Sequence, residues 1–212
     1  MMKINEIYQS IQGESSYVGW PTVFVRTSGC HLRCTYCDTA YAFYEGQKLS
    51  LDDVLTKVSN FSVKHICITG GEPLLQKEIF ELMKQLCDRE YLVSLETSGS
   101  LSCELVDVRV KKIVDVKTPN SGEADSFLME NLKFCTPNDE FKFVICSEQD
   151  FEWTERFVKA HALSSKHVVF YSPSFKKISE KWLAEKILAA KSTARLQLQL
   201  HKYIWSDITR GV

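Results

Sequence analysis

Apolar runs of strand length alternate along this chain with segments of helical period. Seven runs predict strands, at residues 22–26, 65–69, 91–96, 112–116, 140–145, 167–171 and 195–201. Strands that alternate with helices build βαβ units, so this order predicts an α/β fold with a mainly parallel sheet.

Three segments between these strands predict helices. Apolar residues recur at three- and four-residue steps over 75–88. Ser50, with Asp53 three residues later, resembles a capping box that opens a helix over 51–59, and Ser179 starts another helix. The segment 120–138 has no clear period, so we expect a loop there with at most a short helix. No repeat or linker interrupts the pattern, and we expect one domain over residues 1–212.

Most predicted strands end in small, polar or turn-forming residues. The carboxyl ends of parallel strands form the ligand-binding edge of β/α folds, so we expect the functional site there. The residues concerned are Ser28-Gly29, Gly70-Gly71-Glu72-Pro73, Glu96-Thr97-Ser98-Gly99, Lys117-Thr118-Pro119, Ser147-Glu148 and Ser172-Pro173.

The last predicted strand, 195–201, alternates leucine with polar residues. Period two would put Leu196, Leu198 and Leu200 on one face and Gln197, Gln199 and His201 on the other. The polar face is then either solvated or directed toward a ligand inside the fold.

Composition excludes some classes of function. The 212 residues carry 26 Lys and Arg against 27 Asp and Glu, a net charge of −1, which gives no electrostatic basis for nucleic acid as the main partner. An apolar fraction of 44% is enough for a sizeable core. No apolar run reaches the roughly 20 residues that span a bilayer. The N-terminal segment lacks a secretory apolar region, so we expect a cytoplasmic protein with no membrane partner.

Three of the eight cysteines are clustered, and the other five read as buried thiols. Cys30, Cys34 and Cys37 form a Cys-x3-Cys-x2-Cys run. Three thiolates cannot complete a four-ligand metal centre, so a site here recruits a distant group or keeps one position open. A second cysteine pair, typical of zinc modules, is absent, and His31 is awkwardly placed as a fourth ligand. We favour an iron–sulfur cluster over a non-catalytic zinc module.

The cysteine run, with Tyr36 just before the third cysteine, resembles the radical S-adenosylmethionine (SAM) motif. The resemblance implies a [4Fe-4S] cluster whose open iron binds SAM. Reductive cleavage of SAM then gives a 5′-deoxyadenosyl radical that abstracts hydrogen from the substrate. Gly70-Gly71-Glu72-Pro73 resembles the second motif of that superfamily.

Four further segments narrow the resemblance to the 7-carboxy-7-deazaguanine synthase family, over residues 10–203. They are Ser10-Ile11-Gln12-Gly13-Glu14, Phe24-Val25-Arg26, Cys37-Asp38-Thr39 and Gln199-Leu200-His201-Lys202-Tyr203. The resemblance implies a lyase on a partial, abridged β/α barrel. It converts 6-carboxy-5,6,7,8-tetrahydropterin to 7-carboxy-7-deazaguanine with loss of ammonia, in queuosine and deazapurine biosynthesis. The resemblance implies that the hydrogen is abstracted from the carbon that carries the substrate carboxylate and that SAM is regenerated. It also implies Mg²⁺, a homodimer and an electron donor such as flavodoxin or ferredoxin.

The same resemblance assigns site residues, none of them the hydrogen abstractor. It implies substrate contacts at Ile11, Gln12, Gly13, Glu14, Arg26, Thr69 and His201, and Mg²⁺ at Thr39. It implies SAM contacts at Tyr36, Cys37, Asp38, Gly71, Glu72, Glu96, Ser98 and Lys117, with weaker contacts at Ser172 and Pro173. Gln12 and Glu14 suit the donors and acceptors of a pterin, and Arg26 suits a carboxylate.

Simpler interpretations stay open for several of these residues. Gln12 and Glu14 also fit a solvated turn, Arg26 a structural ion pair, and Lys117 a solvated loop lysine. The family commonly has glycine at the position of Ser15, and Ser-Pro-Lys where this chain reads Val116-Lys117-Thr118-Pro119. The family's C-terminal residues also approach the substrate. An activase that installs a glycyl radical on a partner protein is the competing enzymatic hypothesis.

Overall fold

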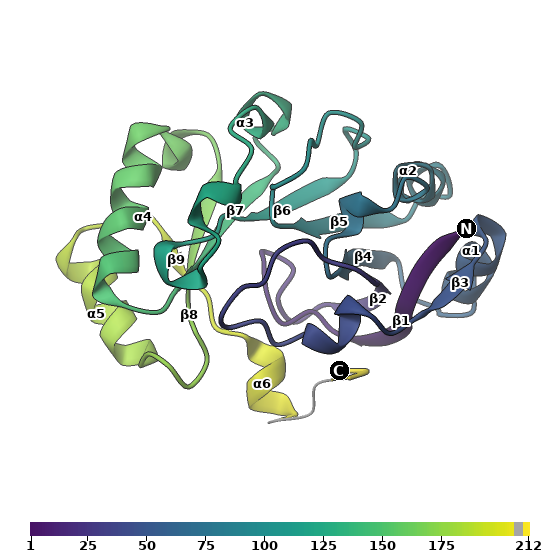
Figure 1. Cartoon of the computed structure of the whole chain (residues 1–212), viewed down its shortest axis with the longest axis horizontal. Coiled ribbons are helices and arrows are strands. Elements are labelled where there is room, and N and C mark those ends of the chain that lie inside the picture. Colours follow the sequence, from purple (N-terminus) through teal and green to yellow (C-terminus); the bar gives the residue numbers. More distant parts are fainter. Residues whose placement is uncertain (206–209) are drawn as a thin grey trace.

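A computed structural model of the chain, which describes residues 1–205 and 210–212, contains a nine-stranded sheet (Figure 1). Its order is β3-β1-β2-β4-β5-β6-β7-β8-β9, and no pairing among the described residues joins β3 to β9. The curved sheet is therefore an open, partial barrel. The strands are β1 (Met2–Ile11), β2 (Pro21–Thr27), β3 (Gln47–Leu49), β4 (His65–Gly70), β5 (Leu92–Thr97), β6 (Lys111–Asp115), β7 (Glu140–Ile145), β8 (Val168–Pro173) and β9 (Arg195–Leu196).

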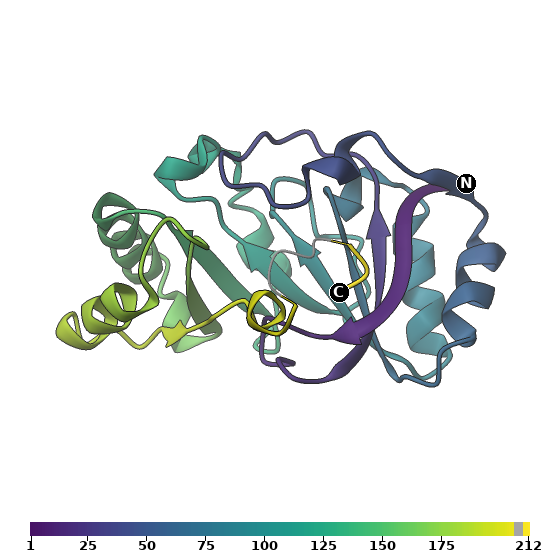
Figure 2. The same ribbon diagram turned by 90° about the horizontal axis from the view of Figure 1, so that it is seen from below.

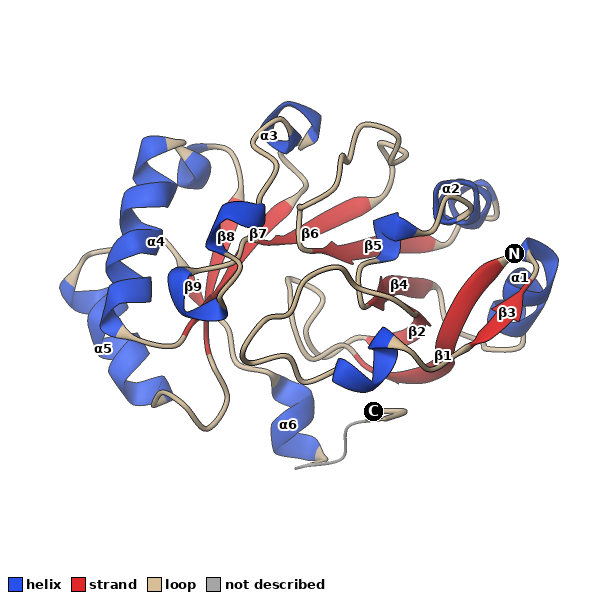
Figure 3. Cartoon of the chain, in the orientation of Figure 1, coloured by secondary structure: helices blue, strands red, loops and turns tan. Residues whose placement is uncertain are grey.

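The predicted mainly parallel α/β fold is confirmed. Neighbouring strands from β2 through β4 to β9 pair in parallel, whereas β1 pairs antiparallel with both β2 and β3. The helices are α1 (Leu51–Ser59), α2 (Ile79–Asp88), α3 (Asn131–Phe134), α4 (Glu148–Ala160), α5 (Glu180–Ala189) and α6 (Leu200–Ile204). Figures 2 and 3 show α1 and α2 outside one end of the sheet and α4 and α5 outside the other.

Two apolar clusters hold the helices on the sheet. One joins the β1–β5 end to α1 and α2 and includes Val25, Ile68 and Leu82, each 0% exposed. The other joins β6–β8 to α4 and α5 and includes Phe143 and Leu183, also 0% exposed. Each such side chain contributes about 1.5–3 kcal/mol relative to its exposed state, so the outer helices fix the curvature of the sheet.

The predicted helix starts agree with the observed caps. Ser50 accepts a hydrogen bond from the Asp53 amide and completes a capping box at α1. The Ser179 side chain accepts from the Trp182 amide at the start of α5. The helix predicted over 75–88 begins later, at Ile79, because Pro73–Leu75 forms a separate 3-10 turn.

The pattern did not predict β1, because a bulge breaks its alternation. Ile4 pairs with Thr27, but the register shifts between Ile4 and Glu6, and Ile7 then pairs with Val25. The extra residue puts Ile4 and Ile7 both against the same apolar cluster, although they are an odd number of positions apart. A strict period of two therefore does not exist along this strand.

Helix α4 was also not predicted, and the last strand was predicted wrongly. The buried face of α4 contains Thr154 and Asp150, so its apolar period is incomplete. The strand predicted over 195–201 ends at Leu196, and α6 follows from Leu200. The leucines do not form a buried face, since Leu196 and Leu198 are 38% and 36% exposed while Gln197 is 5% exposed. In the described part of the chain, no helix is both long and apolar enough to cross a membrane.

Candidate functional site

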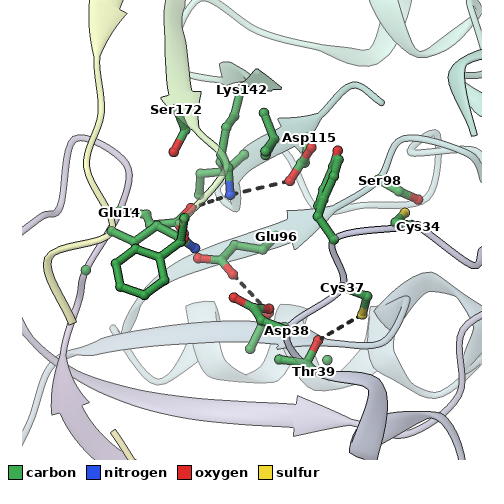
Figure 4. A pocket seen from close by; sticks show the side chains of 18 of the residues that line it. Glu14, Cys34, Cys37, Asp38, Thr39, Glu96, Ser98, Asp115, Lys142 and Ser172 are labelled. Atoms are coloured by element: carbon green, nitrogen blue, oxygen red, sulfur yellow. Dashed lines mark hydrogen bonds and ion pairs between the residues drawn. The ribbon is translucent and has the colours of Figure 1, made fainter. Parts of the chain in front are cut away.

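A cavity of about 620 Å³ opens at the carboxyl ends of the parallel strands. Of the site residues implied by the resemblance, Glu72 and the weaker contact Pro173 do not line it, and the others do. Two segments distant in sequence face each other across it, namely the cysteine loop and the segment after β1 (Figure 4). The implied site residues that line the cavity are Ile11, Gln12, Gly13, Glu14, Arg26, Cys30, Cys34, Tyr36, Cys37, Asp38, Thr39, Thr69, Gly71, Glu96, Ser98, Lys117 and His201.

The cysteine loop is anchored at both ends. The Glu72 amide donates to the Gly29 carbonyl at 2.8 Å, next to Cys30. A Cβ on Gly71 would lie 2.2 Å from the Gly29 oxygen, so only glycine permits this approach. Further along, the Thr35 amide donates to the Ser121 carbonyl at 2.9 Å. The turn after β4 and the loop after β6 therefore set the position of the three cysteines.

The three thiols are available as ligands at the edge of the cavity. All three are free and partly exposed to the cavity. No group of three or more His, Cys, Asp or Glu side chains in the described residues is close enough to hold one ion. Zinc requires its ligands within about 2.3 Å, whereas an iron–sulfur cluster is held by thiolates spread around a larger body. His31, the suggested fourth zinc ligand, instead contacts the Ser100 hydroxyl at 2.9 Å.

Burial raises the pKa of Cys30, and it raises the pKa of Cys34 to about 11. Both groups are therefore protonated thiols before a metal binds. Iron must displace these protons, so assembly of a cluster here depends on pH.

Glu72 lies beneath the cavity, not on its wall. The carboxylate is 0% exposed and accepts hydrogen bonds from the Leu74 amide, the Thr97 hydroxyl, and both the amide and the hydroxyl of Ser98. These contacts join the turn after β4 to the end of β5. Glu72 thus orients Ser98 and does not itself face a ligand.

Glu96, on β5, connects β4 to the segment after β1. Its carboxylate accepts from the Thr69 hydroxyl at 2.9 Å and from the Gln12 amide group at 3.3 Å. Gln12 is 2% exposed as a residue, which rules out the solvated turn considered for it. The Gln12 side-chain oxygen also accepts from the Glu14 amide at 3.2 Å, so Gln12 ties its own segment to the end of β5.

Arg26 is both an ion-pair partner and part of the cavity wall. Its Nε donates to Glu6 at 2.8 Å and one terminal nitrogen donates to the Tyr8 hydroxyl at 2.8 Å. The structural ion pair considered from the sequence is therefore present. A guanidinium has five N–H donors, so donors remain for a ligand in the cavity.

Four charged side chains extend along one wall from the segment after β1 toward the cysteine loop. Glu14 contacts Lys142, the Lys142 Nζ lies 3.3 Å from Asp115, and Lys117 lies 3.0 Å from Asp115. Burial raises the pKa of Glu14, but Lys142, His201 and Gln199 together hold that pKa below its ordinary value. Asp115 behaves likewise, with Lys117 and Lys142 lowering its pKa against burial.

Helix α6 closes one side of the cavity. The Leu200 amide donates to the Gly13 carbonyl at 3.0 Å, and the His201 ring packs so closely that a Cβ on Gly13 would lie 2.1 Å from its Nδ1. Gln199 donates to Glu14 at 2.8 Å. Gln199 and His201 thus both line the cavity, although through a turn and a helix instead of the predicted strand.

One of the described C-terminal residues lies at the same cavity. Val212 lines the cavity. Residues 206–209, which belong to the segment expected to approach the substrate, lie outside the described residues.

Several lining residues were not predicted. Asp115 and Lys142 are charged residues within or at the end of apolar runs, a pattern that could have signalled an interior polar position. Tyr8 and Phe24 also line the cavity and stack with ring centroids 5.1 Å apart. Tyr8 belongs to the strand that the bulge obscured, so nothing in the pattern pointed to it.

Sequence comparisons identify relatives over the whole chain. Residues 24–185 match the model of the Radical SAM superfamily. A 7-carboxy-7-deazaguanine synthase from Chlorobaculum tepidum is 42% identical over 214 residues, which cover 100% of this chain and 97% of the relative. Another from Koribacter versatilis is 43% identical over 226 residues and covers 100% of both chains.

Solved structures support the fold. QueE from Escherichia coli superposes with a TM-score of 0.77 at 24% identity, covering 94% of each chain. TYW1 with a lysine-pyruvate adduct bound has a TM-score of 0.60 at 11% identity, covering 82% of this chain and 74% of that one. These likenesses concern the arrangement of strands and helices.

Proposed function

The chain belongs to the radical SAM superfamily and, within it, to the 7-carboxy-7-deazaguanine synthase family, and we propose that it converts 6-carboxy-5,6,7,8-tetrahydropterin to 7-carboxy-7-deazaguanine. The reaction contracts the ring and releases ammonia, in the route to queuosine and other deazapurines. One observation carries the proposal: the three cysteines and the polar segment after β1 line the same cavity.

Cys30, Cys34 and Cys37 would hold the [4Fe-4S] cluster of this superfamily. When bound and reduced, the cluster supplies the electron that cleaves SAM into methionine and a 5′-deoxyadenosyl radical. The chain's own task is to hold the reacting molecules in register and keep water out. The free, partly exposed thiols at the edge of the cavity fit this role.

Residues on the cysteine side of the cavity would bind SAM. They are Tyr36, Asp38, Gly71, Glu96, Ser98 and Lys117, all of which line the cavity, as does the weaker contact Ser172. Gly71 lets the turn after β4 approach the cysteine loop closely, which places the backbone of this turn beside the three cysteines. We propose that Glu72 supports the SAM site without contacting SAM, because its carboxylate already accepts hydrogen bonds from Leu74 and Ser98.

Residues around the segment after β1 would bind the pterin. Gln12, Glu14 and Thr69 present side-chain donors and acceptors, and Ile11 and Gly13 complete the wall. Burial lowers the pKa of His201, although Glu14 raises it, so the ring is neutral and can accept or donate one hydrogen bond.

Arg26 and Mg²⁺ would hold the substrate carboxylate. The remaining N–H donors of Arg26 suit a carboxylate oxygen. Thr39, which lines the cavity with its hydroxyl 3.8 Å from the Cys37 sulfur, would supply one oxygen ligand. Mg²⁺ binds few protein groups and completes its shell with substrate oxygens and water.

Further parts of the proposal follow the family resemblance. We propose one domain, which the single nine-stranded sheet supports, and a cytoplasmic homodimer. The cluster requires an external electron donor, for which flavodoxin or ferredoxin is proposed. The activase alternative is less well supported, because Gln12, Glu14 and His201 line a cavity at the strand ends, where they suit a small-molecule substrate.

The test is anaerobic reconstitution with iron and sulfide, followed by reaction with SAM, Mg²⁺, a reductant and 6-carboxytetrahydropterin. Mass analysis should find 7-carboxy-7-deazaguanine. A Cys34→Ala control should contain little iron and form no product. One zinc per chain without iron or sulfide, or a full cluster with no product, would each overturn the proposal.

A further inference from the structure

Glu14, Lys142, Asp115 and Lys117 form a row of charged side chains inside the protein, and stability alone does not explain it. The side chains of Glu14, Lys142 and Asp115 are only 11%, 12% and 19% exposed. Buried ion pairs contribute little to stability, and apolar residues of similar size often serve as well. Lys142 and Asp115 have no part in the proposed function as described so far, although both line the cavity.

Lys142 and Glu14 both keep hydrogen-bonding capacity for a ligand. The ammonium has three donors, and among the described residues its partners are Glu14 and Asp115. A carboxylate has about four acceptor positions, of which Lys142 and Gln199 use two in Glu14. Side by side, the two groups present an acceptor next to a donor.

A pterin carries the complementary pair on its pyrimidine ring, where the N3–H donor lies beside the C4 carbonyl acceptor. We propose that Lys142 is a substrate-binding residue, which forms hydrogen bonds with this amide edge together with Glu14. The ammonium donates to the ring carbonyl oxygen, and the carboxylate accepts from the ring N–H and the neighbouring amino group. This inference rests on the proposed function and adds Lys142 to the residues that bind the substrate.

The neighbours of Lys142 place it on the substrate side. Asp115 and Lys142 are register partners on β6 and β7, so the sheet itself sets their contact. Lys117, on the other side of Asp115, lies 5.8 Å from the ring centre of Tyr36 in the cysteine loop. The order along the wall therefore runs from the cofactor half at Lys117 to the substrate half at Glu14.

Lys142 also keeps Glu14 ionised. The groups that face Glu14 are Lys142 from β7, His201 and Gln199 from the segment around α6, and Gln12 on its own segment. Asp115 and Glu96 are the other charged neighbours of Lys142. Burial alone would raise the Glu14 pKa, and Lys142 is the largest opposing influence. Without Lys142, pterin binding should become pH-dependent and weaken as Glu14 takes up a proton at lower pH.

The experiment measures binding without turnover. Reconstituted protein with SAM and an unreduced cluster is titrated calorimetrically with 6-carboxytetrahydropterin and with an analogue that carries a 4-amino group in place of the ring carbonyl. Lys142→Met should bind the 4-oxo compound about 10- to 100-fold more weakly, the effect of losing a hydrogen bond from a charged group. It should also lose the wild-type preference for 4-oxo over 4-amino, and Lys142→Arg should restore part of that preference.

A matched control separates binding from stability. Lys112 is another buried lysine, 3.0 Å from Asp139, and does not line the cavity. Lys112→Met should reduce stability but leave pterin affinity and its pH profile unchanged. Wild-type affinity and selectivity in Lys142→Met, or a loss of SAM affinity with pterin affinity intact, would overturn the inference alone. Failure of the wild-type protein to bind the pterin would refute the proposed function, and the inference with it.

Discussion

Replacing Gly71 with alanine should disturb the cysteine loop without unfolding the protein. The new Cβ would lie 2.2 Å from the Gly29 oxygen and 2.9 Å from the Cys30 Cβ. The shorter contact, between carbon and oxygen, is far below the 3.0 Å under which Cβ contacts essentially never occur, so the turn and the loop must separate. Relaxed overpacking of this kind costs about 1–3 kcal/mol. A domain stable by about 5–15 kcal/mol survives that loss.

The assay is iron content and cluster absorbance after reconstitution, with circular dichroism as a check on folding. Gly71→Ala should stay folded, contain clearly less iron than wild type, and bind SAM at least about tenfold more weakly, which corresponds to ~1.4 kcal/mol. Gly122→Ala is the matched control, because its Cβ would meet only Thr35 in the same loop, at 3.7 Å. Its φ of +79° makes alanine strained without a clash, so iron content should be normal. Full iron and normal SAM affinity in Gly71→Ala would refute the reasoning.

Three further substitutions test other parts of the structure. Arg26→Lys should raise KM for the pterin about tenfold with normal iron content, because lysine lacks the planar fork that serves both protein and ligand; an unchanged KM would remove the carboxylate role. Ser15 has a φ of +63°, so Ser15→Ala should be about 1 kcal/mol less stable than Ser15→Gly in urea denaturation; equal stabilities would contradict the left-handed conformation. Burial lowers the pKa of His65 to about 4. The unfolded state therefore binds the proton more tightly, and stability should fall by about 3 kcal/mol as pH drops from the ordinary value of ~6.5 to 4. His65→Gln should lack this part of the pH dependence, and an unaltered pH profile would show that the ring is not held neutral.

The parallel strands could be predicted because both of their faces are buried. Val23 and Val25 on β2, and Ile66 and Ile68 on β4, form nearly continuous apolar runs that need no fine register to be recognised. The antiparallel strand β1 has no such run, and its bulge between Ile4 and Glu6 removes the alternation that would replace it.

The cysteine loop and the strand-end turns could also be predicted, since each is a local motif. The pairing of Glu14 with Lys142 could not, because the two residues are 128 positions apart. Lys142 alternates with apolar neighbours in β7, a pattern equally typical of a solvated face. Only the curvature of the sheet, set by helices packed on its outer side, turns that face inward.

The central claim is that one cavity brings the cluster, SAM and the pterin together for hydrogen transfer at the carbon that bears the carboxylate. The most direct measurement uses substrate with deuterium at that carbon, followed by mass spectrometry of both product and SAM. Since the resemblance implies that SAM is regenerated, the account predicts 7-carboxy-7-deazaguanine together with SAM that has gained deuterium. Product formation with unlabelled SAM, or labelled substrate recovered unchanged from fully reconstituted protein, would contradict it.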